Sequence, residues 1–247
     1  MAELMRIQPT WDLILQTWHM ILALIPARGG SKRIPGKNTK PFGGLPMIAH
    51  SIRAAHQVGL FDRIMVSTDS DEIMQIARDY GAEAPFRRPA EIANDTASTE
   101  DVLVHALRWL SGQGTPAGFF CCIYATAPFV RSADIQKGYE LLRAENATTA
   151  FPVTTYAYPI FRSLRINSCG RIEMLWPENN DKRSQELPEA YHDAGQFYWG
   201  DTQKFLQEPL LFSSNSVPVV VPRHLVQDID TPEDWAVAEK MFLRLTI

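Results

Sequence analysis

A short basic segment rich in glycine follows the first apolar stretch of the chain. The apolar run 21–25 leads into residues 27–38, which read ARGGSKRIPGKN. Adjacent glycines let backbone N–H groups approach an anion closely, and arginine and lysine side chains supply positive charge. The cations of this segment are Arg28, Lys32, Arg33 and Lys37. This concentration of positive charge predicts a binding site for a polyphosphate.

The segment matches neither of the two common phosphate-binding motifs. A Walker loop has a glycine five residues before its Gly-Lys pair, where this chain has Ser31. Asn38 also replaces the Ser or Thr that would hold magnesium, and the dinucleotide pattern GxGxxG is absent. The sequence therefore predicts a phosphate loop of another class, although a solvated basic loop after a core strand would have the same composition.

A pair of carboxylates near the carboxyl end of the chain could hold a metal ion. If the segment around Asp228 and Asp230 is extended, residues two apart share a face, so both carboxylates point the same way and Ile229 is buried opposite. Two such oxygens suit Mg²⁺ and leave coordination sites for water and phosphate. An Asp-x-Asp before a helix is also typical of a helix cap beside a solvated carboxylate.

Length and charge limit the class of protein. With 247 residues and 45% hydrophobic residues, the chain can form one large α/β domain, which we expect over 20–247. The formal net charge of −4, with basic residues gathered locally, argues against a nucleic-acid partner. Any nucleotide bound is expected to be a small molecule.

The cysteines and the first residues indicate a cytoplasmic protein. Cys121, Cys122 and Cys169 have neither CxxC nor Cys/His spacing and are expected to be reduced core residues. The apolar stretch 11–25 is interrupted by polar residues and falls short of the roughly 20 residues of a membrane span. Residues 1–19 are expected to be an upstream extension, disordered or loosely packed, with neither export nor membrane association.

Strands and helices alternate through the first two thirds of the chain. Strands are expected at 21–25, 63–67, 119–125 and 148–153, and helices at 47–58, 71–80, 98–110 and 132–145. Helix starts are indicated by Ser70 or Asp69, by Ser98 with Asp101, and by Ser132. This alternation predicts an α/β fold of the Rossmann-like, doubly wound type with a mostly parallel sheet.

The pattern changes over residues 154–189. Strand-like runs at 162–166 and 171–175 flank the turn-rich link NSCG and predict a hairpin, followed by the polar stretch 177–188. A segment without an apolar core of its own predicts a projecting arm. An active-site lid is the alternative.

The sheet is expected to resume after this arm. Strands are predicted at 195–199 and 217–221, and Thr231 and Pro232 mark the start of a final helix. Its apolar positions, expected to pack on the sheet, are Trp235, Ala238, Met241, Phe242 and Leu245.

These motifs together resemble a known family. Residues 27–38 resemble the ARxGSKxIPxKN signature of sugar-activating cytidylyltransferases, and VSTD at 66–69, RPAEIANDTAS at 88–98 and ATAP at 125–128 are spaced as in CMP-sialic acid synthetases. The segment that begins at 227 is similar to the metal-binding IDIDTxxD block of that family. The resemblance extends over nearly all of 20–247 and implies a nucleotidyltransferase fold.

The resemblance assigns roles to individual residues. It implies that Arg28, Lys32 and Lys37 contact the triphosphate and neutralise its charge, and that Asp228 and Asp230 hold a metal. The other nucleotide-binding residues implied are Ala27, Gly29, Gly30, Ser31, Asn38, Arg88 and Thr99. Taken by itself, Arg88 could equally be an exposed arginine before a proline.

Departures from the sialic acid enzymes indicate a branch of the family. Tyr124 stands where those enzymes carry glutamine, and YHDAGQ at 191–196 replaces their Asn-Gly pair, so the chain resembles the pseudaminic acid cytidylyltransferases. The sugar-binding residues implied are Tyr124, Thr126, Arg183, Tyr191, His192, Asp193 and Gln196. The His192–Asp193 pair could instead form a hydrogen-bonded turn.

The resemblance implies a Mg²⁺-dependent reaction of CTP with a nine-carbon 2-keto acid sugar. The anomeric hydroxyl would attack the α-phosphate and release pyrophosphate, in a homodimer formed through the arm. CMP-sialic or CMP-legionaminic acid synthesis, and a non-catalytic nucleotide-sensing relative, are the alternatives.

Overall fold

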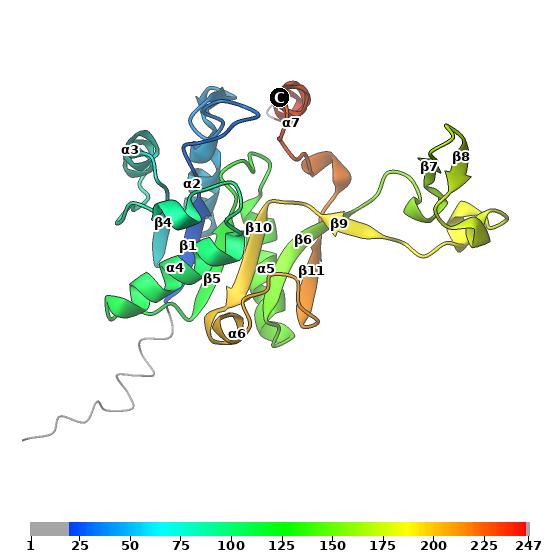
Figure 1. Cartoon of the computed structure of the whole chain (residues 1–247). Coiled ribbons are helices and arrows are strands. Elements are labelled where there is room, and N and C mark those ends of the chain that lie inside the picture. Colours follow the sequence, from blue (N-terminus) through cyan, green and yellow to red (C-terminus); the bar gives the residue numbers. More distant parts are fainter. Residues whose placement is uncertain (1–19, 246–247) are drawn as a thin grey trace, which may run out of the picture.

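The computed structural model describes residues 20–245, so the expected extension 1–19 lies outside the described residues. A seven-stranded sheet forms the centre of this part of the chain (Figure 1). Its strands are β1 (Ile21–Pro26), β4 (Arg63–Ser67), β5 (Phe119–Ile123), β6 (Thr149–Thr155), β9 (Tyr191–Asp193), β10 (Phe197–Asp201) and β11 (Ser216–Val220). Two short strands, β2 (Pro41–Phe42) and β3 (Leu45–Pro46), pair separately.

The strand order places the end of β1 at a switch point of the sheet. The order is β11-β6-β10-β5-β1-β4, with β9 paired to β6. Strand β1 is parallel to both neighbours, β4 and β5, whereas β10 is antiparallel to β5 and β6. The chain therefore leaves β1 toward one side and returns on the other, which opens a crevice at the carboxyl end of β1. The predicted mostly parallel, doubly wound sheet is confirmed.

Helices cover both faces of the sheet. They are α2 (Met47–Val58), α3 (Asp71–Asp79), α4 (Thr99–Gly112), α5 (Ser132–Ala144), α6 (Thr202–Gln207) and α7 (Pro232–Leu245). Apolar residues of α2, α3 and α5 pack on one face of the sheet, and those of α4 and α6 pack on the other. Adjacent side chains of β5 point to opposite faces of the sheet: Cys121 packs with α2, α3 and α5, and Cys122 packs with α4 and α6. Both thiols are buried and free, as expected.

Three of the four helix starts read from the sequence are confirmed, including that of α7, where Thr231 Oγ1 accepts from the Asp234 N–H. The Ser98 side chain accepts from the Asp101 N–H, and Asp101 accepts from the Ser98 N–H, which completes a capping box. Ser70 caps α3 by accepting from the Ile73 N–H. The prediction for Ser132 is wrong: Arg131 occupies the N-cap position, and no side-chain cap is present there. Arg131 forms an ion pair with Asp134 in the first turn instead.

The final helix α7 packs on the basic loop rather than on the sheet. Trp235 and Ala238 join a separate apolar cluster with Ile34 of the loop, Phe42 of β2 and Ile229. Leu245 is exposed, so the expectation that it packs on the sheet is wrong. The apolar spacing identified a buried helix face but could not identify the surface that covers it.

The segment after β6 projects from the sheet as an arm (Figure 1). It carries the predicted hairpin, formed by β7 (Leu164–Ile166) and β8 (Ile172–Met174), and returns to the sheet through β9. Ile166 and Ile172 are 76% and 70% exposed, which matches an arm without an apolar core. Cys169 lies in the hairpin turn and is exposed, so the expectation of a core cysteine is wrong there.

Short 3₁₀ helices complete the described chain. They are η1 (Ala90–Ile92), η2 (Ile160–Arg162), η3 (Pro177–Asn179), η4 (Ser184–Glu186) and η5 (Arg223–Leu225). Within residues 20–245, no helix combines the length and apolar character that a membrane crossing requires.

A glycine in α5 allows this helix to approach the sheet closely. A Cβ atom at Gly138 would lie 2.8 Å from Trp199 Cδ1 and 2.9 Å from Phe197 Cε2, both in β10. We predict that Gly138→Ala lowers the free energy of unfolding by about 1–3 kcal/mol, because the packed rings must move. Urea unfolding followed by circular dichroism measures the change.

Gly112→Ala in α4 is the matched control. An added Cβ atom there meets no atom within 4 Å. Alanine is the better helix former, so this variant should be neutral or slightly stabilising. Equal losses in the two variants would contradict the packing argument.

Candidate active site

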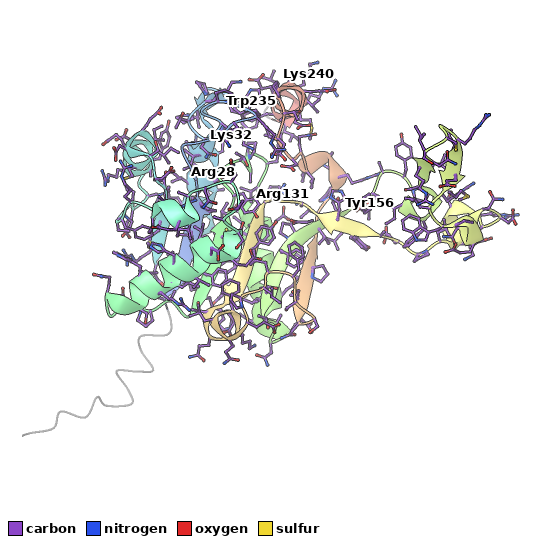
Figure 2. The ribbon with its side chains drawn as sticks, viewed as in Figure 1. Arg28, Lys32, Arg131, Tyr156, Trp235 and Lys240 are labelled. Atoms are coloured by element: carbon purple, nitrogen blue, oxygen red, sulfur yellow. The ribbon has the colours of Figure 1, made fainter. Side chains whose placement is uncertain are left out.

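A cavity of about 260 Å³ opens at the carboxyl ends of β1 and β5. Five of the ten residues predicted to bind or neutralise the nucleotide line it, although they lie far apart in the sequence, whereas Ala27, Gly29, Gly30, Ser31 and Lys32 do not. Its lining includes Arg28, Lys37, Asn38, Arg88, Asp95, Thr99, Tyr124 and Thr126. Figure 2 shows Arg28 and Lys32 on this edge of the sheet. The cavity coincides with the switch point of the sheet, where folds of this kind bind ligands.

Hydrogen bonds to neighbouring elements fix the shape of the basic loop. The Ala27 N–H donates to the Ser67 carbonyl at 3.0 Å, and Asn38 Nδ2 donates to the Arg28 carbonyl at 2.9 Å. Asn38 is buried, so its amide positions Arg28 as well as lining the cavity.

The two loop glycines have different surroundings. The Gly29 N–H donates to Asp69 Oδ1 at 2.8 Å, and a Cβ atom at Gly29 would lie 3.0 Å from Ser70 Cβ. Gly29 thus serves close packing, and its N–H already has a partner. A Cβ atom at Gly30 would meet nothing within 4 Å, and the Ser31 N–H bonds the Gly29 carbonyl at 3.1 Å. Gly30 is the more accessible of the two for a ligand.

Two carboxylates pair with the four cations of the loop. Arg28 Nη1 and Lys32 Nζ each lie 2.5 Å from an oxygen of Asp95, and hydrogen bonds from both cations lower the pKa of that carboxyl. Arg33 and Lys37 lie 2.9 and 3.3 Å from Asp230 Oδ1. Asp95 lies in the block 88–98, but its pairing with Arg28 could not be predicted, because the proximity of the two residues depends on the tertiary fold.

Arg88 is buried beneath the cavity with 6% of its surface exposed, so the alternative of an exposed arginine is wrong. Its Nε donates to Ser67 Oγ at 3.0 Å and its Nη2 to the Ser67 carbonyl. Burial lowers the pKa of Arg88 to about 10, with Asp69 acting in the opposite direction. The guanidinium is therefore a positive charge held in a fixed position in the lining of the cavity.

A chain of hydroxyl groups links the cavity to the predicted sugar-binding segment. Thr99 Oγ1 and the Tyr124 hydroxyl lie 3.0 Å apart, and the rings of Tyr124 and Tyr198 are 5.2 Å apart. The Tyr198 hydroxyl donates to Asp193 Oδ2, and the Gly195 N–H donates to Asp193 Oδ1 at 3.0 Å. Burial raises the pKa of Tyr124 to about 12, so its hydroxyl stays protonated. The place of Tyr198 within the expected strand 195–199 did not predict this contact, because the approach of Tyr198 to Tyr124 depends on the tertiary fold.

The other predicted sugar-binding residues occupy different places. Thr126 lines the cavity, whereas Gln196 is buried and its Nε2 donates to the Leu225 carbonyl at 2.7 Å. His192 Nδ1 lies 2.9 Å from the Asp193 carbonyl in β9. Arg183 is on the arm, and Tyr191 is at its stem, with its hydroxyl bonded to Glu189. Within one chain, neither residue lines the cavity.

The predicted metal ligands lie beside the basic loop. Ile229 is buried, while Asp228 is exposed and Asp230 is partly exposed, so both carboxylates are open to solvent although the segment is not a strand. Partial loss of hydration at the carboxyl group, followed by the charge of Asp230, raises the pKa of Asp228. Lys37 Nζ donates to the Ile229 carbonyl at 2.7 Å.

The donor set around these carboxylates fits a hard cation that is shared with a ligand. Among residues 20–245, no group of three or more His, Cys, Asp or Glu side chains is arranged to hold a metal ion. A cation at Asp228 and Asp230 would therefore take its remaining oxygen ligands from water and phosphate, which is typical of Mg²⁺ sites.

A basic loop at the switch point of a doubly wound sheet, beside a carboxylate pair, defines a nucleotidyltransferase. The model of the cytidylyltransferase family matches residues 22–232. The chain belongs to the cytidylyltransferase family.

Curated relatives cover most of this chain. A pseudaminic acid cytidylyltransferase of Campylobacter jejuni is 40% identical over 90% of this chain and 95% of its own length. A CMP-N,N'-diacetyllegionaminic acid synthase of Legionella pneumophila is 31% identical over 90% and 95%. A solved structure of CMP-2-keto-3-deoxy-manno-octonic acid synthetase with CTP matches with a TM-score of 0.65 at 19% identity, over 92% of this chain and 99% of that one. At this identity, the structure supports the fold alone.

The buried Tyr198 hydroxyl gives a test of the hydroxyl chain. We predict that Tyr198→Phe lowers the free energy of unfolding by about 1–3 kcal/mol, because Asp193 loses a buried donor. Chemical denaturation measures the change.

Tyr139→Phe is the control, since its hydroxyl makes an exposed bond to Arg143 at 3.2 Å while its ring also packs on aromatic neighbours. It should change the free energy of unfolding by less than about 0.5 kcal/mol. A loss in Tyr198→Phe no greater than in this control would show that the Asp193 contact is not stabilising.

Proposed function

We propose that the protein transfers CMP from CTP to the anomeric hydroxyl of pseudaminic acid and releases pyrophosphate. The observation that carries this proposal is the cavity in which Arg28, Lys37 and Arg88 meet Thr99 and Tyr124. Positive charge and hydroxyl groups in the lining of one small cavity suit a nucleoside triphosphate. The family match from residue 22 to 232 supports CTP as the nucleotide.

The choice of sugar rests on the relatives and on residues 191–196. Identity is 40% to the Campylobacter jejuni pseudaminic acid cytidylyltransferase and 31% to the legionaminic acid enzyme. Asp193 connects to the cavity through the side chains of Tyr198, Tyr124 and Thr99. Fixed polar groups can reject a sugar that leaves them unpaired. CMP-legionaminic and CMP-sialic acid synthesis are the alternatives within the family.

The reaction requires alignment and charge neutralisation more than covalent chemistry from the protein. The anomeric oxygen forms a bond to the α-phosphorus, and the bond to the bridging oxygen breaks as pyrophosphate leaves. The triphosphate would be neutralised by Arg28, Lys32 and Lys37. The side-chain amide of Asn38 holds Arg28 in place by donating to the Arg28 carbonyl. Arg88 would supply a fixed positive charge below the nucleotide.

We further propose that Asp228 and Asp230 hold Mg²⁺. The ion would neutralise phosphate charge and orient the triphosphate. Asp230 now contacts Arg33 and Lys37, so these cations would be free to contact phosphate when Asp230 binds metal.

The arm is proposed to form a homodimer in the cytoplasm. Large apolar side chains are exposed along it: Tyr158, Leu164, Ile166, Ile172 and Leu175. Burying such a surface against a second copy would remove apolar area from water. Arg183, which lies on the same arm, would then approach the partner rather than its own cavity.

Sugar preference is measured directly by pyrophosphate release. With CTP and Mg²⁺, we predict that pseudaminic acid gives the highest kcat/KM in a panel that includes legionaminic, sialic and 3-deoxy-octulosonic acids. Preference for another sugar would keep the cytidylyltransferase chemistry and overturn the proposed specificity. Release with none of the sugars would overturn the proposed reaction.

The carboxylate pair is tested by removing one charge at a time. Asp228→Asn and Asp230→Asn should each lower kcat about 100-fold or more, because a ligand of the cation is weakened. Asp79→Asn in α3, whose carboxylate bonds Gln75 at 2.8 Å, removes the same charge away from the cavity and should retain activity. Thermal unfolding checks that all three variants are folded. Near-normal rates of the first two at saturating Mg²⁺ would exclude them as ligands.

A further inference from the structure

A single carboxylate bridges two cations at the mouth of the cavity. Arg28 Nη1 contacts Asp95 Oδ1 and Lys32 Nζ contacts Asp95 Oδ2, each at 2.5 Å. The two oxygens thus serve different cations, as two oxygens of a phosphate group would. Asp95 also lines the cavity. The carboxylate therefore occupies the position at which the proposed function requires phosphate oxygens.

The chain on both sides of Asp95 is held in a defined shape. The side-chain oxygen of Asn94 accepts from the Thr96 and Ala97 N–H groups, each at 2.9 Å. The Ser98–Asp101 capping box then starts α4. Asp95 thus projects from an organised turn between η1 and α4, and its position does not depend on the two ion pairs alone.

Asp95 must compete with some ligands and not with others. Arg28 and Lys32 cannot give their full charge to Asp95 and to phosphate oxygens at once, and a carboxylate beside a phosphate is repelled. The side chains of Arg28, Asp95 and Lys32 are 35%, 44% and 79% exposed, so the competition is moderate rather than prohibitive. It affects ligands that use both cations, such as triphosphate and pyrophosphate. CMP, which has one phosphate, is affected little.

We propose that Asp95 is an internal counter-anion of the basic loop that weakens pyrophosphate binding and so favours pyrophosphate release. The proposal rests on the proposed function, since it takes Arg28 and Lys32 to be the cations that hold the outgoing pyrophosphate. As pyrophosphate leaves, Asp95 returns to both cations and prevents them from remaining unpaired. The residue thereby determines which phosphate ligands the site retains.

The test is calorimetric titration of the full chain with pyrophosphate, CMP and CTP in the presence of Mg²⁺. Asp95→Asn keeps the side-chain size and removes the charge. It should bind pyrophosphate severalfold more tightly than the unaltered protein and bind CMP with nearly unchanged affinity. In steady-state assays, pyrophosphate should inhibit this variant at severalfold lower concentration. If Asp95 had only a structural role, its replacement would lower the affinity for pyrophosphate, CMP and CTP alike.

Two further variants make the result specific. Asp71→Asn removes the same charge from an ion pair of equal length, 2.5 Å to Arg87, and should leave pyrophosphate affinity unchanged. Asp95→Glu retains the charge and should bind pyrophosphate as weakly as the unaltered protein. This variant keeps the test available if Asp95→Asn is poorly folded. Tighter binding of pyrophosphate by Asp95→Glu would overturn the proposal.

The outcomes separate this inference from the proposed function. If the unaltered protein binds CTP but Asp95→Asn binds pyrophosphate no more tightly, Asp95 is not a counter-anion, and the proposed function stands. If the unaltered protein binds no CTP, both are overturned.

Discussion

The contact between Lys37 and the segment before α7 holds the two halves of the candidate site together. Lys37 Nζ donates to the Ile229 carbonyl and lies 3.3 Å from Asp230, while the Ile229 side chain is buried with Ile34 of the basic loop. The basic loop near the amino end and the carboxylate pair near the carboxyl end are therefore joined by a hydrogen bond, an ion pair and a shared apolar cluster. Without the apolar cluster, the two charged segments would have no fixed separation.

Charge balance explains how such a basic loop is tolerated in the fold. The four cations between positions 28 and 37 are paired with two carboxylates, Asp95 and Asp230, that come from different parts of the chain. Each pair is partly exposed, so it contributes little to the stability of the fold. The pairs fix the directions of long side chains, and a ligand that replaces the carboxylates then finds its cations already positioned.

The arm follows a different physical rule from the sheet. The strands β1 and β5 are buried on both faces by helices, so their residues are apolar without interruption. The hairpin β7–β8 is held by its strand pairing, by the Arg165–Glu173 ion pair across the two strands and by two bonds to the Asn167 side chain, and it leaves Ile166 and Ile172 exposed. The hairpin is therefore held by local contacts instead of an apolar core.

The sequence by itself determined the alternating elements, the phosphate loop and the carboxylate pair, because each rests on local spacing: buried runs, capping residues and charges close together in the chain. The tertiary structure decided what those elements touch. It placed α7 on the loop instead of the sheet, buried Arg88 against Ser67, left Ser132 without a capping role and brought Asp95 to Arg28 across 67 residues. Such contacts depend on the relative positions of strands and helices, which no local pattern encodes.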